Sequence, residues 1–360
     1  MIKKLYYISE IFVPSVSAYS IHVMKICNEF SNFFNKTSLL VFRKTKNQNF
    51  HKIYKCKNNF NIIDFNISKN NFFTRILYAL KIIIFLKKKD SIIISRSIIS
   101  ALLLNIFQKK VILEIHHTLE GFTKFLFYFF KKFQNFQNIK FIFISKKLKK
   151  DFNLKNKSII LDDAVDVNDF NIKKKEKIYK NTCAYTGSFA KGKGIENILK
   201  IASYYKHIKF HLYGDFSNSI YSKNYFKDFK NVDYKGYLNY KEIPITLSKY
   251  HILLLPYSKK VYVRSNNLET GQHMSPLKLF DYLSSGKVII ASKMPVYAHI
   301  LNKKNSILLN FDQHKKWANK IDYVFKNLKI FNKLKLNALN TAKKNTWNQR
   351  VKKIIKFIND

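Results

Sequence analysis

Short apolar runs alternate with longer amphipathic stretches along the 360 residues of the chain. Brief apolar runs are typical of buried parallel strands, and apolar residues that recur every three or four positions indicate helices. In the first half the pattern predicts strands at 4–8, 37–42, 91–95, 111–115 and 141–144, and helices at 21–33, 76–87, 121–133 and 146–152. In the second half it predicts strands at 182–185, 209–213, 232–235, 252–255 and 288–291, and helices at 195–205, 243–249 and 278–285.

This alternation predicts an α/β fold made of two Rossmann-like, doubly wound domains. A chain of 360 residues is long enough for two domains that each bury a core. We expect the boundary near Phe170, in the stretch 162–177 that changes from acidic to basic residues. The expected domains are 1–170 and 171–345, and a helix over 346–360 is expected to pack back toward the N-terminal domain.

The composition is strongly basic, with 66 Lys and Arg against 22 Asp and Glu and a net charge of +44. Both halves share the excess, so we interpret it as a general bias in residue usage, with attraction to acidic lipid head groups or phosphates as a by-product. No zinc-finger spacing, RNA-binding signature or separate basic arm is present. Nucleic acid is therefore not the expected partner.

The cysteines and the longest apolar region indicate a cytoplasmic protein. Cys27, Cys56 and Cys183 form no CxxC pair, which argues against a disulfide framework or a zinc site. The apolar region 72–107 is interrupted by charged residues, so it lacks the roughly 20 apolar residues of a membrane span. The N-terminus is interpreted as a first strand and not as a signal peptide.

The segment YTGSFAKGKGIENILKIA (185–202) runs from a strand through glycines and Lys193 into a helix. Glycines there let the backbone approach an anionic ligand, and an exposed loop lysine can reach a diphosphate. The spacing matches neither the dinucleotide nor the P-loop motif. By itself the segment is equally compatible with an ordinary turn that carries a solvated lysine.

The segment HMSPLKLFDYLSSGKVIIASKMP (273–295) predicts a helix with Pro276 at its first position and Gly286 after its end. The backbone amides of 275–278 would then face an anion, and Asp281 would accept hydrogen bonds from ribose hydroxyls. The alternative is that Pro276 and Gly286 only delimit a helix whose solvated face carries Asp281. The two segments together favour a nucleotide-diphosphate site.

On these segments the sequence resembles the family-4 retaining glycosyltransferases of the GT-B fold (glycosyl transferases group 1), of the bacterial surface-polysaccharide type. The likeness extends over nearly the whole chain. Its other parts are FVPSVSAYSIHVMKIC (12–27), LEIHHT (113–118), FISKKLK (143–149), DDAVDVNDF (162–170), HLYGD (211–215), VDYKGYL (232–238) and TWNQRVKKII (346–355).

The resemblance implies two domains that face each other across a cleft, and it implies roles for individual residues. The catalytic residues are His117, Lys193 and Asp281. The residues implied to bind the donor diphosphate are Gly187, Ser188, Lys193, Ser275, Pro276, Leu277 and Lys278. Those implied to bind the nucleoside are Gly214, Tyr237, Leu238 and Asp281, and His273 is implied to contact the transferred sugar. The implied acceptor-side loop contains Ser17, Ala18, Tyr19, Ser20 and His22.

Three positions depart from the family pattern. Ser188 stands where many members have Arg, His273 stands at the first acid of the acid-x7-acid pair, and Ala18 replaces a glycine. Charge on the leaving diphosphate then has to be met by Lys193 and Lys278. The donor sugar cannot be inherited from the family.

The implied activity is a metal-independent retaining hexosyl transfer from a UDP- or GDP-sugar to a lipid-linked or surface-glycan acceptor, as in lipopolysaccharide or capsule biosynthesis. No cofactor or metal is expected, and DDAVD (162–166) is interpreted as a junction. The alternatives are a nucleotide-sugar epimerase and a basic nucleic-acid-binding protein. The stretch 121–132, rich in Phe and Lys, is either a peripheral contact with an anionic membrane at the inner face or an aromatic core helix.

Overall fold

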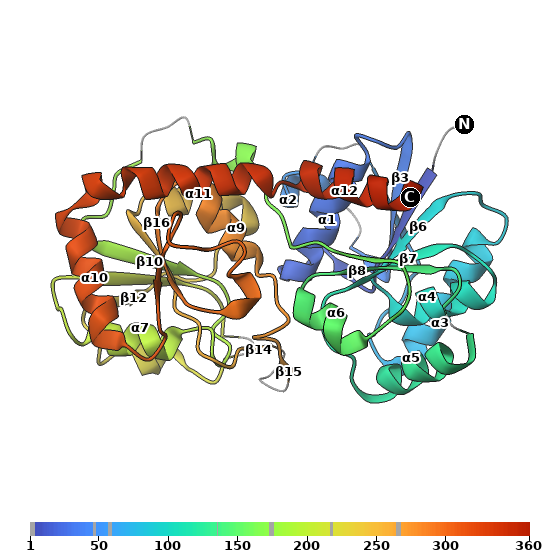
Figure 1. Cartoon of the computed structure of the whole chain (residues 1–360), viewed down its shortest axis with the longest axis horizontal. Helices are drawn as coiled ribbons and strands as arrows, with labels where there is room; N and C mark the ends of the chain where they lie inside the picture. Colours follow the sequence, from blue (N-terminus) through green and yellow to red (C-terminus); the bar gives the residue numbers. More distant parts are fainter. Residues whose placement is uncertain are drawn as a thin grey trace. The chain divides into compact units, whose positions relative to one another are not determined.

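The chain forms two compact units in the computed structural model (Figure 1). The described residues are 4–45, 48–56, 60–134, 136–172, 176–216, 219–263 and 268–360, so the basic residues 173–175 of the expected boundary lie outside them. Unit 1 comprises Met1–Asp162 and Trp347–Asp360, and unit 2 comprises Asp163–Thr346. The division thus follows Asp162, whereas the sequence suggested a boundary near Phe170.

Unit 1 is built on a seven-stranded parallel sheet in the order β5-β3-β1-β6-β7-β8-β9. These strands are β1 (Lys4–Ile8), β3 (Lys36–Val41), β5 (Asn61–Asp64), β6 (Ile92–Ser95), β7 (Val111–Ile115), β8 (Ile139–Phe143) and β9 (Ser158–Ile160). A short pair joins β2 (Phe12–Val13) to β4 (Arg43–Lys44). The helices are α1 (Ala18–Phe30), α2 (Phe50–Ile53), α3 (Phe72–Leu86), α4 (Ile98–Ile106), α5 (Gly121–Gln134), α6 (Lys146–Phe152) and α12 (Trp347–Asn359).

The C-terminal helix α12 packs within unit 1. The ring centroid of Trp347 lies 5.0 Å from that of His22 on α1, and the Asn348 amide donates to the Glu29 carboxylate at 2.6 Å. Arg350 donates to the carbonyl of Leu161 at 2.7 Å, at the end of the unit's main segment. The last residues of the chain therefore complete the unit that the first residues begin.

Unit 2 contains a six-stranded parallel sheet in the order β12-β11-β10-β13-β16-β17. Its strands are β10 (Thr182–Thr186), β11 (Lys209–Tyr213), β12 (Val232–Tyr234), β13 (Ile252–Leu255), β16 (Val288–Ser292) and β17 (Ile307–Leu309); β14 (Tyr262–Val263) and β15 (Leu268–Glu269) form an antiparallel pair. The α-helices are α7 (Ile195–Ala202), α8 (Ile243–Ser248), α9 (Leu277–Ser284), α10 (His314–Lys326) and α11 (Asn332–Lys344). Single 3-10 turns lie at Val167–Phe170, Lys223–Phe226, Tyr240–Glu242, Pro295–Tyr297 and Leu328–Phe331.

Two apolar layers cover the two faces of this second sheet. One contains Leu279 of α9 and Ala338 of α11, and the other contains Ile198 of α7 and Trp317 of α10. Helices on both faces of a parallel sheet are the doubly wound arrangement. The predicted α/β class with Rossmann-like halves is confirmed.

The sequence pattern missed several elements for physical reasons. Helix α4 (IISALLLNI) is apolar nearly all round and largely buried, so its sequence shows no amphipathic period. The strands β5, β9 and β17 are short and only half-buried. Helix α1 begins three residues before the predicted position 21, because the Ser17 side chain caps it by accepting from the Ser20 amide at 3.2 Å.

Candidate functional site

Segments far apart in the sequence of unit 2 meet at the carboxyl edge of its sheet. The strand order reverses between β10 and β13, and a crevice at such a reversal is where doubly wound sheets bind ligands. The loop after β10, Tyr257 after β13 and the start of α9 converge there.

Gly187 leaves room for a lysine. Its φ is +133°, in the region that favours glycine. A Cβ atom at this position would lie 2.9 Å from the Nζ atom of Lys278. Gly214 after β11 is equally confined, because its Cβ would lie 2.1 Å from the Gly187 carbonyl oxygen. Glycine at both positions therefore lets two strand ends and a lysine side chain approach one another.

The side-chain nitrogen of Lys278, in the first turn of α9, is buried beside two aromatic rings. Its Nζ lies 3.8 Å from the ring centroid of Tyr185 and 4.9 Å from that of Tyr257. Among the described residues this nitrogen has no hydrogen-bond partner. Burial, with a contribution from Lys193, lowers its pKa well below the usual range for lysine. Within the described parts of the chain no carboxylate forms an ion pair with it.

Lys193 lies near the same tyrosine. Its Nζ is 5.3 Å from the Tyr257 ring centroid, and burial lowers its pKa to about 8. The expectation of an exposed loop lysine is wrong, since the residue is half-buried. Two cations that disfavour each other's charge would both be stabilised by an anion placed between them.

The start of α9 differs in detail from the expectation. Pro276 is the N-cap residue, with φ −79° and ψ 123°, and the helix begins at Leu277. Proline has no amide hydrogen, so the predicted row of amides over 275–278 is interrupted at that residue. The Ser275 hydroxyl accepts a hydrogen bond from the Asp163 amide at 2.8 Å, which ties the first residue of unit 2 to this helix start.

Asp281 lies inside α9 and is only 5% exposed. The alternative that it occupies the solvated face is therefore wrong. Its neighbour Tyr282 accepts a hydrogen bond from the Thr186 amide at 2.9 Å, which joins α9 to the end of β10. Gly286, with φ +63°, follows the helix as predicted.

The remaining predicted donor residues occupy varied positions in unit 2. The Ser188 carbonyl accepts from the Tyr185 hydroxyl at 2.9 Å. The amide of His273, which is half-buried, donates to the Thr270 carbonyl at 2.9 Å. Tyr237 is 40% exposed, and Leu238 packs against the apolar layer under α9.

Sequence reasoning missed the tyrosines that surround the lysines. Tyr185 lies in β10 and Tyr257 lies two residues beyond β13, so both belong to the carboxyl edge. Their position at the carboxyl ends of strands could have identified them from the sequence, because ligand-binding side chains in such sheets follow the strand ends. Both side chains are fully buried, and burial raises the pKa of each hydroxyl well above its usual range.

The predicted acceptor-side residues of unit 1 lie on helix α1 and not in a loop. Ser17 is the N-cap residue and Ala18, Tyr19, Ser20 and His22 lie in the helix, so only Ser17 of these five residues precedes it. Tyr19 lies under the Arg96 guanidinium, with 3.9 Å from its carbon to the ring centroid. The side chain of His22 is buried.

The two histidines after β7 have different surroundings. The Nε2 atom of His116 lies 3.0 Å from the Glu114 carboxylate, and burial lowers the His116 pKa to about 3. His116 is therefore neutral and directed inward. His117 is half-buried, with Nδ1 2.8 Å from the carbonyl of Thr118. Of the pair, His117 remains the candidate for catalysis.

Among the described residues, His22, Glu114 and His116 have the spacing of a metal site, with ligand atoms within 4.8 Å of one another. The Glu114 carboxylate, however, already pairs with Arg350 and accepts from the Tyr7 hydroxyl at 2.5 Å. Burial opposes its charge, but the Arg350 guanidinium and the hydrogen bond with His116 hold the pKa of Glu114 well below the usual range. We interpret this group as an internal ion pair, since a metal ion would meet the guanidinium.

Two parallel-sheet units, each doubly wound, are the architecture of the GT-B fold. The family of glycosyl transferases group 1 matches residues 168–358, more than half of the chain, and the protein belongs to this family. No curated protein matches the sequence.

Several solved structures share the fold over nearly the full length. A glycosyltransferase from Rickettsia africae ESF-5 is 16% identical with a TM-score of 0.75, covering 98% of this chain and 97% of that one. Anabaena Alr3699/HepE in complex with UDP and glucose is 12% identical with a TM-score of 0.70, covering 98% and 99%. WaaG, a glycosyltransferase involved in lipopolysaccharide biosynthesis, is 11% identical with a TM-score of 0.65, covering 98% and 99%.

Proposed function

We propose that this glycosyltransferase transfers a hexose, with retention, from a UDP- or GDP-sugar to a lipid-linked or surface-glycan acceptor, as in lipopolysaccharide or capsule biosynthesis. The observation that carries the proposal is the buried, unpartnered Nζ of Lys278, which shares Tyr257 with the half-buried Lys193. Two lysines with no ion pair to a carboxylate among the described residues fit a diphosphate, whose negative charge would favour their protonated forms. The UDP and glucose of the Anabaena structure and the lipopolysaccharide role of WaaG support the choice of substrates.

The chemistry follows from the charge that develops during transfer. When the bond between the sugar and the diphosphate breaks, negative charge builds on the leaving oxygen, and fixed cations stabilise that charge more than they stabilise the bound donor. Lys193 and Lys278 supply this stabilisation in our proposal, so the reaction needs no metal or added cofactor. Their desolvation strengthens the effect, because charges interact more strongly away from water.

Other residues recognise the donor in this proposal. Asp281 binds the ribose, and His273 contacts the transferred sugar. Gly187, Ser188, Ser275 and Leu277 border the diphosphate, and Gly214, Tyr237 and Leu238 border the base. On unit 1, His117 acts in catalysis beside the reacting sugar. Ser17, Ala18, Tyr19, Ser20 and His22 serve acceptor recognition. Peripheral attachment to the cytoplasmic face of the inner membrane would bring the enzyme to a lipid-linked acceptor.

A binding test comes first. UDP or GDP should raise the thermal midpoint of the wild-type protein, because a ligand that binds only the folded state stabilises it by mass action. Lys278→Met should lose this response, whereas Lys206→Met, at an exposed position on the same unit, should keep it. If neither nucleotide shifts the wild-type midpoint, the proposed donor site is wrong.

A second test separates transfer from epimerisation. The protein is incubated with UDP- and GDP-sugars, with and without an extract of lipid-linked glycans, and the products are analysed by NMR. Transfer with an unchanged anomeric configuration supports the proposal. An epimerised donor sugar without any acceptor would instead identify a nucleotide-sugar epimerase.

A further inference from the structure

Helix α3 carries two apolar stripes, of which one is exposed. Its buried residues include Tyr78, Ile82 and Leu86. On the other side, the exposed fractions range from 47% to 79% for four residues spaced by three or four positions: Phe73, Leu77, Leu80 and Ile84. A helix that is apolar all round is normally buried all round, so the exposed stripe indicates a contact with something other than this chain.

Helix α5 repeats the pattern with aromatic residues. Phe127 is fully buried, and its ring lies 4.9 Å from that of Phe136. Four other phenylalanines are 46–65% exposed at helical spacing: Phe122, Phe125, Phe129 and Phe133. The interpretation of this segment as an aromatic core helix is therefore wrong for these four residues. Their rings form a row, with centroids 5.5, 6.2 and 4.7 Å apart.

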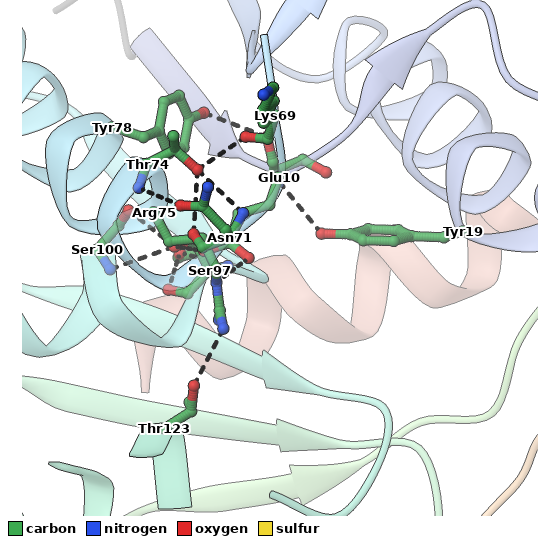
Figure 2. Close-up of polar contacts among 12 residues, drawn as sticks. Glu10, Tyr19, Lys69, Asn71, Thr74, Arg75, Tyr78, Ser97, Ser100 and Thr123 are labelled. Carbon is green, nitrogen blue, oxygen red and sulfur yellow. Dashed lines mark hydrogen bonds and ion pairs between the residues drawn. The ribbon is translucent and has the colours of Figure 1, made fainter. Parts of the chain in front are cut away.

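The two stripes join at the beginnings of the helices. The ring centroids of Phe72 and Phe122 are 4.6 Å apart. A polar tie fixes this junction: Arg75 on α3 donates to Glu10 at 2.8 Å and to the Thr123 hydroxyl on α5 at 3.0 Å (Figure 2). Because one guanidinium holds both helix starts, the two helices and the stripes that they carry begin side by side.

We name this surface the α3/α5 face and define it by eight exposed residues, namely Phe73, Leu77, Leu80, Ile84, Phe122, Phe125, Phe129 and Phe133. Neither helix contains an acidic residue. Exposed lysines flank the face at the end of α3 and along α5, at Lys87, Lys88, Lys124 and Lys132. Exposed Asp90 and Glu120 lie near the helix ends, so lysines predominate at the border while the centre is aromatic and aliphatic.

We infer that the α3/α5 face docks on an anionic phospholipid bilayer. Phenylalanine and leucine side chains enter the interface between head groups and acyl chains, while lysines at the border attract anionic head groups. A second copy of the chain is a poorer fit, because it would bring a second set of lysines against the first. No helix among the described residues is long and apolar enough to cross a membrane. The inference deepens the membrane part of the proposed function.

The test uses the full-length protein and sedimentation with vesicles. Vesicles of equal parts phosphatidylcholine and phosphatidylglycerol should bind the wild type, and vesicles of phosphatidylcholine alone should bind it much less. Phe125→Ser with Phe129→Ser should lower the partition coefficient about tenfold or more, because apolar contact area is lost. The matched control is Ile330→Ser with Leu336→Ser, which removes two equally exposed apolar residues from unit 2 and should bind as the wild type does.

The charge at the border is tested separately. Lys124→Gln and Lys132→Gln should each lower binding to the mixed vesicles about fivefold at low salt. Lys315→Gln and Lys316→Gln, at exposed positions on α10, are the controls and should have a smaller effect.

Two further measurements show whether a variant that loses vesicle binding is still folded and still binds nucleotide. The phenylalanine variant should keep its thermal midpoint and its response to UDP, so that lost vesicle binding is neither unfolding nor failure of the donor site. The inference is overturned if this variant and the control bind vesicles equally. It is also overturned if the wild type self-associates in gel filtration and only the phenylalanine variant becomes monomeric, since the face would then join two copies.

Discussion

Replacing Lys193 by methionine should stabilise the ligand-free protein while weakening its response to nucleotide. Burial lowers the pKa of this lysine to about 8 from 10.5. This difference means that the fold disfavours the protonated form by about 3 kcal/mol relative to the unfolded chain. Because Lys193 is half-buried and partly solvated, we expect about 1–2 kcal/mol of added stability in the variant at pH 7.

The difference in stability between the wild type and Lys193→Met should depend on pH. A lysine whose pKa is depressed by folding binds fewer protons in the folded state than in the unfolded state between pH 8 and 10.5. As the pH rises from 8 to 10.5, the free energy of unfolding of the wild type should therefore increase relative to that of the variant. The reason is that stability rises with pH wherever the unfolded state holds more protons. The advantage of Lys193→Met should be greatest below pH 8 and disappear above 10.5.

Nucleotide binding should change in the opposite direction. A hydrogen bond to a charged group contributes about 1.5–3 kcal/mol, so losing one from Lys193 should weaken UDP or GDP binding about 10- to 100-fold. Urea denaturation from pH 7 to 11 and titration calorimetry measure the two effects, with Lys206→Met as the control. A variant that is less stable at pH 7, or that binds the nucleotide as tightly as the wild type, would refute the reasoning.

Three further variants test separate parts of the structure. Gly187→Ala places a methyl group 2.9 Å from a lysine nitrogen and should weaken nucleotide binding in calorimetry. Gly121→Ala in unit 1, with φ +52° and open surroundings, should only reduce stability. Glu114→Gln leaves Arg350 buried without its carboxylate and should cost about 3–5 kcal/mol in urea denaturation. Asp281→Asn should lower affinity for UDP more than for pyrophosphate; an equal loss for both would exclude a ribose contact.

The sequence by itself determined the repeating units and the local elements of the proposed donor site. Buried parallel strands need continuous apolar runs, so all ten strands predicted from such runs are present within a few residues of their expected ends. Local chemistry also located Lys193, Lys278 and Asp281, because glycine turns and helix starts beside strand ends are visible in the chain. The conformation of the loop after β10 was also determined by local sequence, because Gly187 has a positive φ that favours glycine.

Only the tertiary structure decided which side chains share an environment. Tyr185, Tyr257 and Lys278 are brought together by strand order, and no local pattern predicts that a lysine nitrogen will lie between two buried rings. Arg350 and Glu114 pair across 236 positions of the chain. The same limit applies to α3 and α5: a helix with two apolar stripes has the same sequence whichever stripe is buried, and packing against the rest of unit 1 makes that choice.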